Sequence, residues 1–201
     1  MVNPMSKTCE FFFDFGSPTT YLAATQLPAI ARDTGATLLW RPMLLGGVFK
    51  ATSNSSPVTV PAKGRWMLQD LQRWARRYGV PLKFNPNFPI NTLTLMRIAA
   101  GLQLRSSDQF ERYVDAAFQA MWVQPRSLGD AEVLNGWLAE AGFDAAALLA
   151  LAADAEVKAR LVATTEEAVA RGAFGAPTIF VGNQMFFGQD RLDFVREALA
   201  A

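Results

Sequence analysis

The 201-residue sequence contains no histidine and a single cysteine, Cys9. Without histidine, a Ser-His-Asp triad, a Cys-His pair and a histidine metal site are all excluded, and we expect no bound metal. One cysteine cannot pair within the chain, so an intrachain disulfide and a Cys-x-x-Cys redox pair are excluded as well. We interpret Cys9, which precedes a phenylalanine-rich segment, as a small packing residue.

An excess of charge of one sign and a long apolar run are also missing. The net charge is +1, which argues against a strongly basic surface for nucleic acid. No apolar run is long enough to span a bilayer, and residues 1–10 lack the apolar region of a secretory signal. We therefore expect a cytoplasmic protein whose partners include neither nucleic acid nor membrane. The 51% of apolar residues suffice for the core of one domain, with or without a large insertion.

The N-terminal part of the chain predicts a βαβ unit. Residues 10–15 have the near-continuous apolar pattern of a strand buried on both faces, and residues 37–41 predict a second strand. Between them, Ser17 suits an N-cap and Pro18 suits the first helical position, so a helix begins here. Pro28 predicts a kink or a break in that helix. The two strands are expected to be parallel.

The middle and the end of the chain complete the fold. Residues 42–61, rich in Gly, Ser, Thr and Pro, predict a long loop. Helical spacing of apolar residues then predicts helices over 64–78, 91–102, 107–121, 130–141, 144–152 and 154–171. The segments 178–181 and 184–187 predict a hairpin around Gly182-Asn183, followed by a last amphipathic helix.

This order is βαβ, then helices, then ββα. It predicts an α/β, thioredoxin-like fold with a large all-helical insertion. We assign residues 10–45 and 173–201 to a discontinuous thioredoxin-like domain and residues 46–172 to the helical insertion.

Ser17 is the first candidate for chemistry, because it stands where a redox cysteine would be expected in such a fold. A helix N-terminus exposes unpaired N–H groups and the positive end of the dipole, which stabilises an anion such as a thiolate. No histidine can accept the serine proton, so we do not expect a nucleophile. Ser17 can instead donate a hydrogen bond to the thiolate of another molecule; the alternative is a plain N-cap.

Pro177 is the second candidate. An X-Pro bond at the start of a buried strand is a candidate cis bond, which would present the main chain of Ala176 to an extended peptide-like ligand. The alternative is a trans proline at a strand start.

Charged and aromatic residues supply weaker candidates. Asp190 and Arg191, at the start of the last helix, can hold an ammonium and a carboxylate, or can be an N-cap and a solvated charge. Lys50, Asn54 and Lys63 suit a carboxylated substrate, but in isolation are better explained as solvated loop groups. The role of Arg41 is open, because the sequence does not fix where its side chain points. The tryptophans Trp66, Trp74 and Trp122 suit either the core or an aromatic pocket.

Together these motifs resemble those of the 2-hydroxychromene-2-carboxylate isomerases, a branch of the DsbA-like superfamily close to kappa-class glutathione transferases. The resemblance covers nearly the whole chain. Its segments are DFGSP (14–18), YLA (21–23), RP (41–42), LGGVFK (45–50), DLQRW (70–74), FPINTL (88–93), FGAPT (174–178) and FFGQDRL (186–192).

The resemblance implies glutathione as cofactor, with its thiol beside Ser17 as the catalytic residue. The implied glutathione-binding residues are Ser17, Pro18, Thr19, Asn54, Ala176, Pro177, Asp190 and Arg191, and the implied substrate-binding residues are Arg41, Lys50, Asn54 and Lys63. Of these, Asp190 and Arg191 match the positions that hold the γ-glutamyl end, and Asn54 matches a contact to the glycyl end.

The implied reaction interconverts 2-hydroxychromene-2-carboxylate and trans-o-hydroxybenzylidenepyruvate, or related intermediates of aromatic catabolism, by reversible thiolate addition. A homodimer is also implied, since relatives are often dimers. Two alternatives remain: a kappa-like glutathione transferase or peroxidase, and a non-catalytic module that binds glutathione or another thiol peptide.

Overall fold

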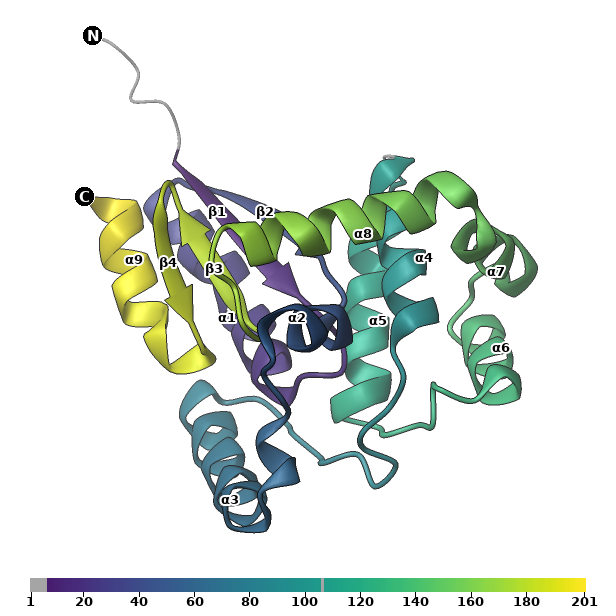
Figure 1. Cartoon of the computed structure of the whole chain (residues 1–201), viewed down its shortest axis with the longest axis horizontal. Coiled ribbons are helices and arrows are strands. Elements are labelled where there is room, and N and C mark those ends of the chain that lie inside the picture. Colours follow the sequence, from purple (N-terminus) through teal and green to yellow (C-terminus); the bar gives the residue numbers. More distant parts are fainter. Residues whose placement is uncertain (1–6, 106) are drawn as a thin grey trace, which may run out of the picture.

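The computed structural model describes residues 7–105 and 107–201, and a mixed sheet lies at one end of it beside a group of helices (Figure 1). The strands are β1 (Thr8–Phe13), β2 (Thr37–Pro42), β3 (Thr178–Val181) and β4 (Gln184–Phe187), in the order β2-β1-β3-β4. β1 pairs with β2 in parallel, while β3 is antiparallel to both β1 and β4. The two ends of the chain therefore meet in the centre of the sheet.

The helices between and around the strands are α1 (Pro18–Thr34), α2 (Leu45–Thr52), α3 (Pro61–Tyr78), α4 (Leu93–Leu104), α5 (Phe110–Trp122), α6 (Ala131–Glu140), α7 (Ala145–Ala153), α8 (Ala155–Ala170) and α9 (Leu192–Ala200). Short 3-10 turns cover Pro57–Thr59 and Gln189–Arg191. The expected order βαβ, helices, ββα is confirmed, and with it the thioredoxin-like fold with a helical insertion. The division at residues 45/46 and 172/173 stays a prediction.

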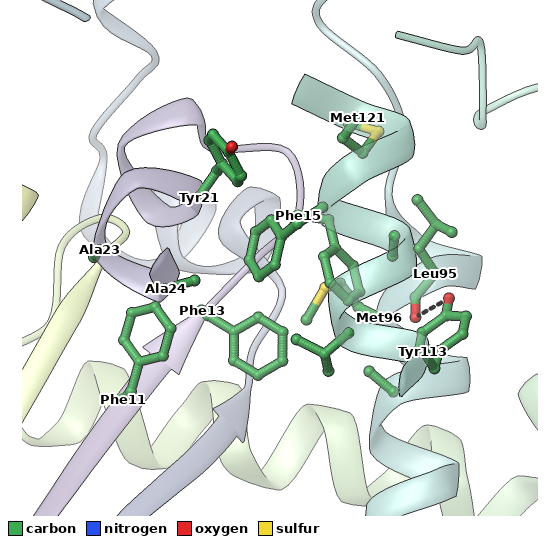
Figure 2. Close-up of a cluster of buried hydrophobic side chains, with 14 of the residues drawn as sticks. Phe11, Phe13, Phe15, Tyr21, Ala23, Ala24, Leu95, Met96, Tyr113 and Met121 are labelled. Atoms are coloured by element: carbon green, nitrogen blue, oxygen red, sulfur yellow. Dashed lines mark hydrogen bonds between the residues drawn. The ribbon is translucent and has the colours of Figure 1, made fainter. Parts of the chain in front are cut away.

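The phenylalanine run of β1 is buried on both faces of the sheet, as its sequence predicts. Phe11 and Phe13 pack into the larger core, whereas Phe12 packs with Phe180 into a smaller core under α2 and α8. Figure 2 shows the larger core continuing from Phe13 to the helices α4 and α5, where the Tyr113 hydroxyl donates to a main-chain carbonyl at 3.0 Å. Because side chains alternate along a strand, a run without polar residues is what a two-faced central strand requires.

Several helix boundaries follow directly from the sequence. Asp130, Asp144 and Asp154 each accept hydrogen bonds from main-chain N–H groups of the first turn, so all three are N-caps. Gly35 and Gly79 end α1 and α3 in the left-handed conformation that glycine adopts without a steric cost.

Two local expectations are wrong, and of the kink or break expected at Pro28 the break is contradicted. α1 continues through Pro28 without a break, because one lost main-chain donor is outweighed by the packing of the buried face of α1. Residues 42–61 are not a loop: they contain α2, whose Val48 is fully buried against the sheet, and a 3-10 turn. α4 begins after Thr92 rather than Asn91, although the Asn91 side chain does accept from the N–H of Leu93 at 3.0 Å.

Candidate functional site

A pocket of about 500 Å³ lies at the N-terminus of α1. α2 and α3 form its sides, and the loop before β3 and the turn after β4 complete it. We call it the Ser17 pocket. Its position at the end of β1, where the strand turns into a helix, is a common place for ligand sites in α/β folds.

Ser17 lies at the floor of this pocket and is only 5% exposed. Its Oγ accepts from the N–H of Thr20 at 3.2 Å, which makes it the N-cap of α1. The same hydroxyl donates to the carbonyl of Ala176 at 3.0 Å and lies 2.8 Å from the hydroxyl of Thr19. Ser17 is thus an N-cap and also connects α1 to the loop at Pro177.

The loop before β3 has the geometry that its proline suggested. The Ala176–Pro177 bond is cis. The Ala176 carbonyl already accepts from two hydroxyls, those of Ser17 and of Thr19 at 3.2 Å. Of the two main-chain groups of Ala176 expected to pair with a peptide-like ligand, the carbonyl is therefore already hydrogen-bonded within the protein. Within residues 7–105 and 107–201, no group accepts from the Ala176 N–H, and the N–H of Thr19 has no intrahelical acceptor because of its place in the first turn. These two donors suit the main-chain carbonyls or carboxylate of a peptide-like ligand.

Asp14 is a site residue that sequence reasoning passed over. Its side chain is 1% exposed and accepts from the N–H groups of Gly16 at 2.8 Å and Leu45 at 2.7 Å and from the hydroxyl of Thr92 at 2.7 Å. Burial raises the pKa of this carboxyl, and the three hydrogen bonds lower it in part. One carboxylate therefore fixes the turn into α1, the start of α2 and the residue before α4.

Some of the polar residues expected at the pocket line it, and others do not. Asn54, Lys63 and Asp190 line the Ser17 pocket, as do Pro18 and Thr19. The Asn54 side-chain amide donates to the carbonyl of Phe174 at 2.8 Å, which ties the end of α2 to the loop before β3. Arg191 does not line the pocket; its guanidinium lies 2.8 Å from the Asp190 carboxylate.

Arg41 lies elsewhere. Its guanidinium pairs with Glu10 at 2.8 Å and with Glu167 of α8, and it lies over the ring of Phe12. Arg171 joins the same network at 2.9 Å from Glu10. Two carboxylates already neutralise the Arg41 charge, so its placement favours a structural ion pair over a contact with substrate. Lys50 also faces away from the Ser17 pocket, toward a second cavity described below.

Aromatic side chains form the wall opposite Ser17. Phe174 and Phe187 have ring centroids 4.5 Å apart, and Trp66, 60% exposed, lines the same pocket. Gly175 permits this arrangement, because a Cβ there would lie 2.8 Å from the Phe187 ring. In the sequence, Phe174 directly precedes the Gly-Ala-Pro segment and Phe187 directly precedes the Gly-Gln-Asp segment. Neither phenylalanine was among the candidate site residues predicted from the sequence.

The other tryptophans belong to the core. Trp122 is fully buried, and its indole N–H donates to the carbonyl of Phe15 at 2.7 Å; Trp74 packs against Tyr78. Cys9 is fully buried, which confirms its packing role, and burial together with the nearby Glu10 raises the pKa of its thiol to about 12.

In residues 7–105 and 107–201, no group of three or more Cys, Asp or Glu side chains is placed to hold a metal ion. No helix in the same ranges has the length and the apolar character needed to cross a membrane.

Comparisons with known proteins agree with this geometry. Residues 8–200 match the family model described as a DSBA-like thioredoxin domain, so the chain belongs to the DsbA-like thioredoxin family. Within it, the chain is 38% identical to a 2-hydroxychromene-2-carboxylate isomerase of Sphingobium xenophagum, over 97% of this chain and 99% of that protein. The resemblance to that isomerase family is thereby confirmed.

Two further similarities bear on the class of protein. A solved structure of a 2-hydroxychromene-2-carboxylate isomerase superposes with a TM-score of 0.82 at 31% identity, covering 96% of this chain and 94% of that one. Human glutathione S-transferase kappa 1 is 28% identical over 98% of this chain and 93% of its own length. The names of these relatives support an enzyme, and an isomerase in particular.

Proposed function

We propose that this protein is a glutathione-dependent isomerase acting on 2-hydroxychromene-2-carboxylate or a related intermediate of aromatic catabolism. The observation that carries the proposal is the Ser17 hydroxyl, which lines a pocket at the positive end of α1 and lies 3.0 Å from the main-chain carbonyl of Ala176. The names of the isomerase and kappa-class relatives support the same activity.

The donors and charges of the Ser17 pocket suit a tripeptide thiol. The N–H groups of Thr19 and Ala176 would pair with ligand oxygens near the sulfur. Lys63 and the Asn54 amide line the pocket and suit a terminal carboxylate, and the Asp190 carboxylate, in the same lining, suits an ammonium group. The ends of glutathione carry these charges.

The net reaction changes no oxidation state. The bond between the ring oxygen and C2 breaks, the ring oxygen gains a proton to become a phenol, the C2 hydroxyl becomes a ketone, and the ring double bond passes from cis to trans. A double bond cannot rotate freely, so the change of geometry needs temporary loss of that bond. When bound, glutathione would supply the thiolate that adds to the double bond and is expelled after rotation.

The residues of the pocket stabilise that thiolate and orient the substrate. Ser17 has one hydroxyl proton, which is shared with Ala176 and Thr19 in this structure. When Ser17 turns its proton toward a sulfur anion, Thr19 still donates to the Ala176 carbonyl, so no buried acceptor loses its last partner. The aromatic wall of Trp66, Phe174 and Phe187 offers apolar area for the substrate ring.

Two measurements test the proposal. Isothermal titration calorimetry should detect binding of reduced glutathione, and absorbance should follow conversion of 2-hydroxychromene-2-carboxylate only when glutathione is present. Equal conversion without glutathione would overturn the thiol mechanism. Binding without conversion, together with conjugation of an electrophile such as 1-chloro-2,4-dinitrobenzene, would favour a kappa-like transferase instead.

A further inference from the structure

A second cavity, of about 590 Å³, is lined by residues of α2, α4 and α8. Figure 1 shows where these three helices lie in the fold. We call it the α8 cavity. It shares α2 with the Ser17 pocket but uses another face of that helix: Gly47, Lys50 and Ala51 line the α8 cavity, whereas Leu45 and Phe49 line the Ser17 pocket. Its volume is in the range of small-molecule sites.

Positive charge is concentrated at this cavity. Lys50 from α2, Arg97 from α4 and Lys158 from α8 all line it, against one carboxylate, Glu166. None of the three cations forms an ion pair with any residue that the structure describes. Arg105, at the end of α4, contrasts with them, since it pairs with both Asp154 and Glu156.

Two of the three cations, Arg97 and Lys158, are only partly exposed, whereas Lys50 is exposed. Removing a charge from water is unfavourable unless an opposite charge or hydrogen bonds compensate it. A bound anion would supply that compensation for Arg97 and Lys158, and Lys50 of α2 would add a third, exposed contact.

The remaining lining of the cavity is apolar. Leu93, Leu161 and Val162 contribute aliphatic surface, and Val162 is 54% exposed although it is large and apolar. Thr165 offers no free donor at the floor, because its hydroxyl donates to the Leu161 carbonyl at 2.7 Å. That hydroxyl also accepts from the N–H of Leu44 at 3.0 Å. A ligand here would be apolar along one side and anionic at one end.

We propose that the α8 cavity is a binding site for a small amphipathic carboxylate, separate from the Ser17 pocket. The carboxylate lies among Lys50, Arg97 and Lys158, and the apolar body lies against Leu161 and Val162. This site requires neither glutathione nor turnover, so its test is independent of the proposed isomerase activity.

The first test uses 1-naphthoate as the probe and neutral 1-naphthamide as its matched comparison. Methyl NMR of the full-length protein should show shifts at Leu161 and Val162 with naphthoate, and affinity for naphthamide should be weaker by about tenfold, as expected for loss of a hydrogen bond to a charged group. Arg97→Gln should lower naphthoate affinity by a similar factor. Arg160→Gln, an exposed position of α8 that does not line the cavity, should leave it unchanged.

A second pair of variants locates the site by shape. Ala170→Trp should fill the mouth of the cavity and weaken naphthoate binding, whereas Ala163→Trp, exposed on the same helix but outside the lining, should not.

Equal binding of the two probes, or equal loss in both members of either variant pair, would overturn the proposal. Methyl shifts confined to the Ser17 pocket would also overturn it. So would self-association that Ala170→Trp abolishes and Ala163→Trp retains, since the cavity would then be a subunit contact.

Discussion

Replacing Ser17 by alanine separates its structural role from its proposed chemical role. The hydroxyl makes three contacts: it accepts from Thr20 N–H, it donates to the Ala176 carbonyl, and it lies next to the Thr19 hydroxyl. Loss of the N-cap costs about 0.5–2 kcal/mol of folding free energy. The Ala176 carbonyl keeps the Thr19 hydroxyl as a donor, so no larger penalty for an unsatisfied buried group is expected.

The same change is also expected to raise the pKa of the thiol of bound glutathione. A hydrogen bond to a charged group contributes about 1.5–3 kcal/mol, which corresponds to a rise of roughly one to two units in the pKa of the bound thiol. Ultraviolet absorbance of the thiolate, followed against pH in the saturated complex, measures that pKa directly. Below the new pKa a smaller fraction of the thiol is ionised, and turnover should fall in proportion to that fraction.

Asp130→Ala is the matched control for this experiment. It removes the N-cap of α6, where the carboxylate accepts from the N–H groups of Glu132 and Val133 at 2.9 and 3.1 Å, and it lies outside the Ser17 pocket. We expect a comparable loss of stability in urea unfolding with no change in the thiol pKa. If Ser17→Ala leaves that pKa unchanged, or if Asp130→Ala shifts it equally, the role given to the Ser17 hydroxyl is refuted.

Three further predictions concern packing. Trp122→Phe should lower the free energy of unfolding by about 2–4 kcal/mol in urea denaturation, because it leaves a cavity and a buried carbonyl without its donor; a loss below about 1 kcal/mol would contradict this. Gly101→Ala places a Cβ 2.6 Å from Leu151 and should destabilise by about 1–3 kcal/mol, whereas Gly136→Ala, with open space around it in α6, should stabilise by up to about 1 kcal/mol; the same sign for both would be the contrary result. Burial holds the pKa of Cys9 at about 12, so its thiol should react with a disulfide reagent at pH 8 only after addition of denaturant, and fast labelling of the native protein would count against this.

The order of elements along the chain and most helix boundaries could be predicted from the sequence because their causes are local. An aspartate that caps a helix, a glycine that ends one and a run of apolar residues in a strand act over a few positions. The two-faced burial of β1 and the three aspartate N-caps are examples. At Pro177 the sequence left a cis and a trans bond as alternatives, and the bond is cis.

The errors have distant causes. α2 lies in a segment whose Gly, Ser and Thr content suggests a loop, yet Val48 is buried against the sheet and the helix packs on α8, which follows more than a hundred positions later. α1 continues through Pro28 because the packing of its buried face outweighs the lost main-chain donor. No local pattern reports either contact.

For Arg41, the sequence could not predict the ion-pair partners of the side chain, and its contact with substrate stays a prediction. The resemblance to known isomerases suggested a contact with substrate, and its place near a strand end suited that role. The side chain instead lies between Glu10 of the neighbouring strand and Glu167 of α8, a carboxylate separated from it by 126 positions. Ion pairs between distant segments cannot be read from spacing along one chain.

Asp14 links the fold to the geometry of the Ser17 pocket. Its carboxylate holds the turn that places Ser17, and it also binds the first N–H of α2 and the hydroxyl of Thr92 before α4. α2 in turn forms walls of both the Ser17 pocket and the α8 cavity. A side chain that lines neither cavity thus fixes three segments around one buried carboxyl, and a shift of any of them would change the position of the Ser17 hydroxyl. The burial that makes Asp14 effective for this purpose also raises its pKa, so the precision of the site is obtained at a cost in stability wherever that carboxyl is ionised.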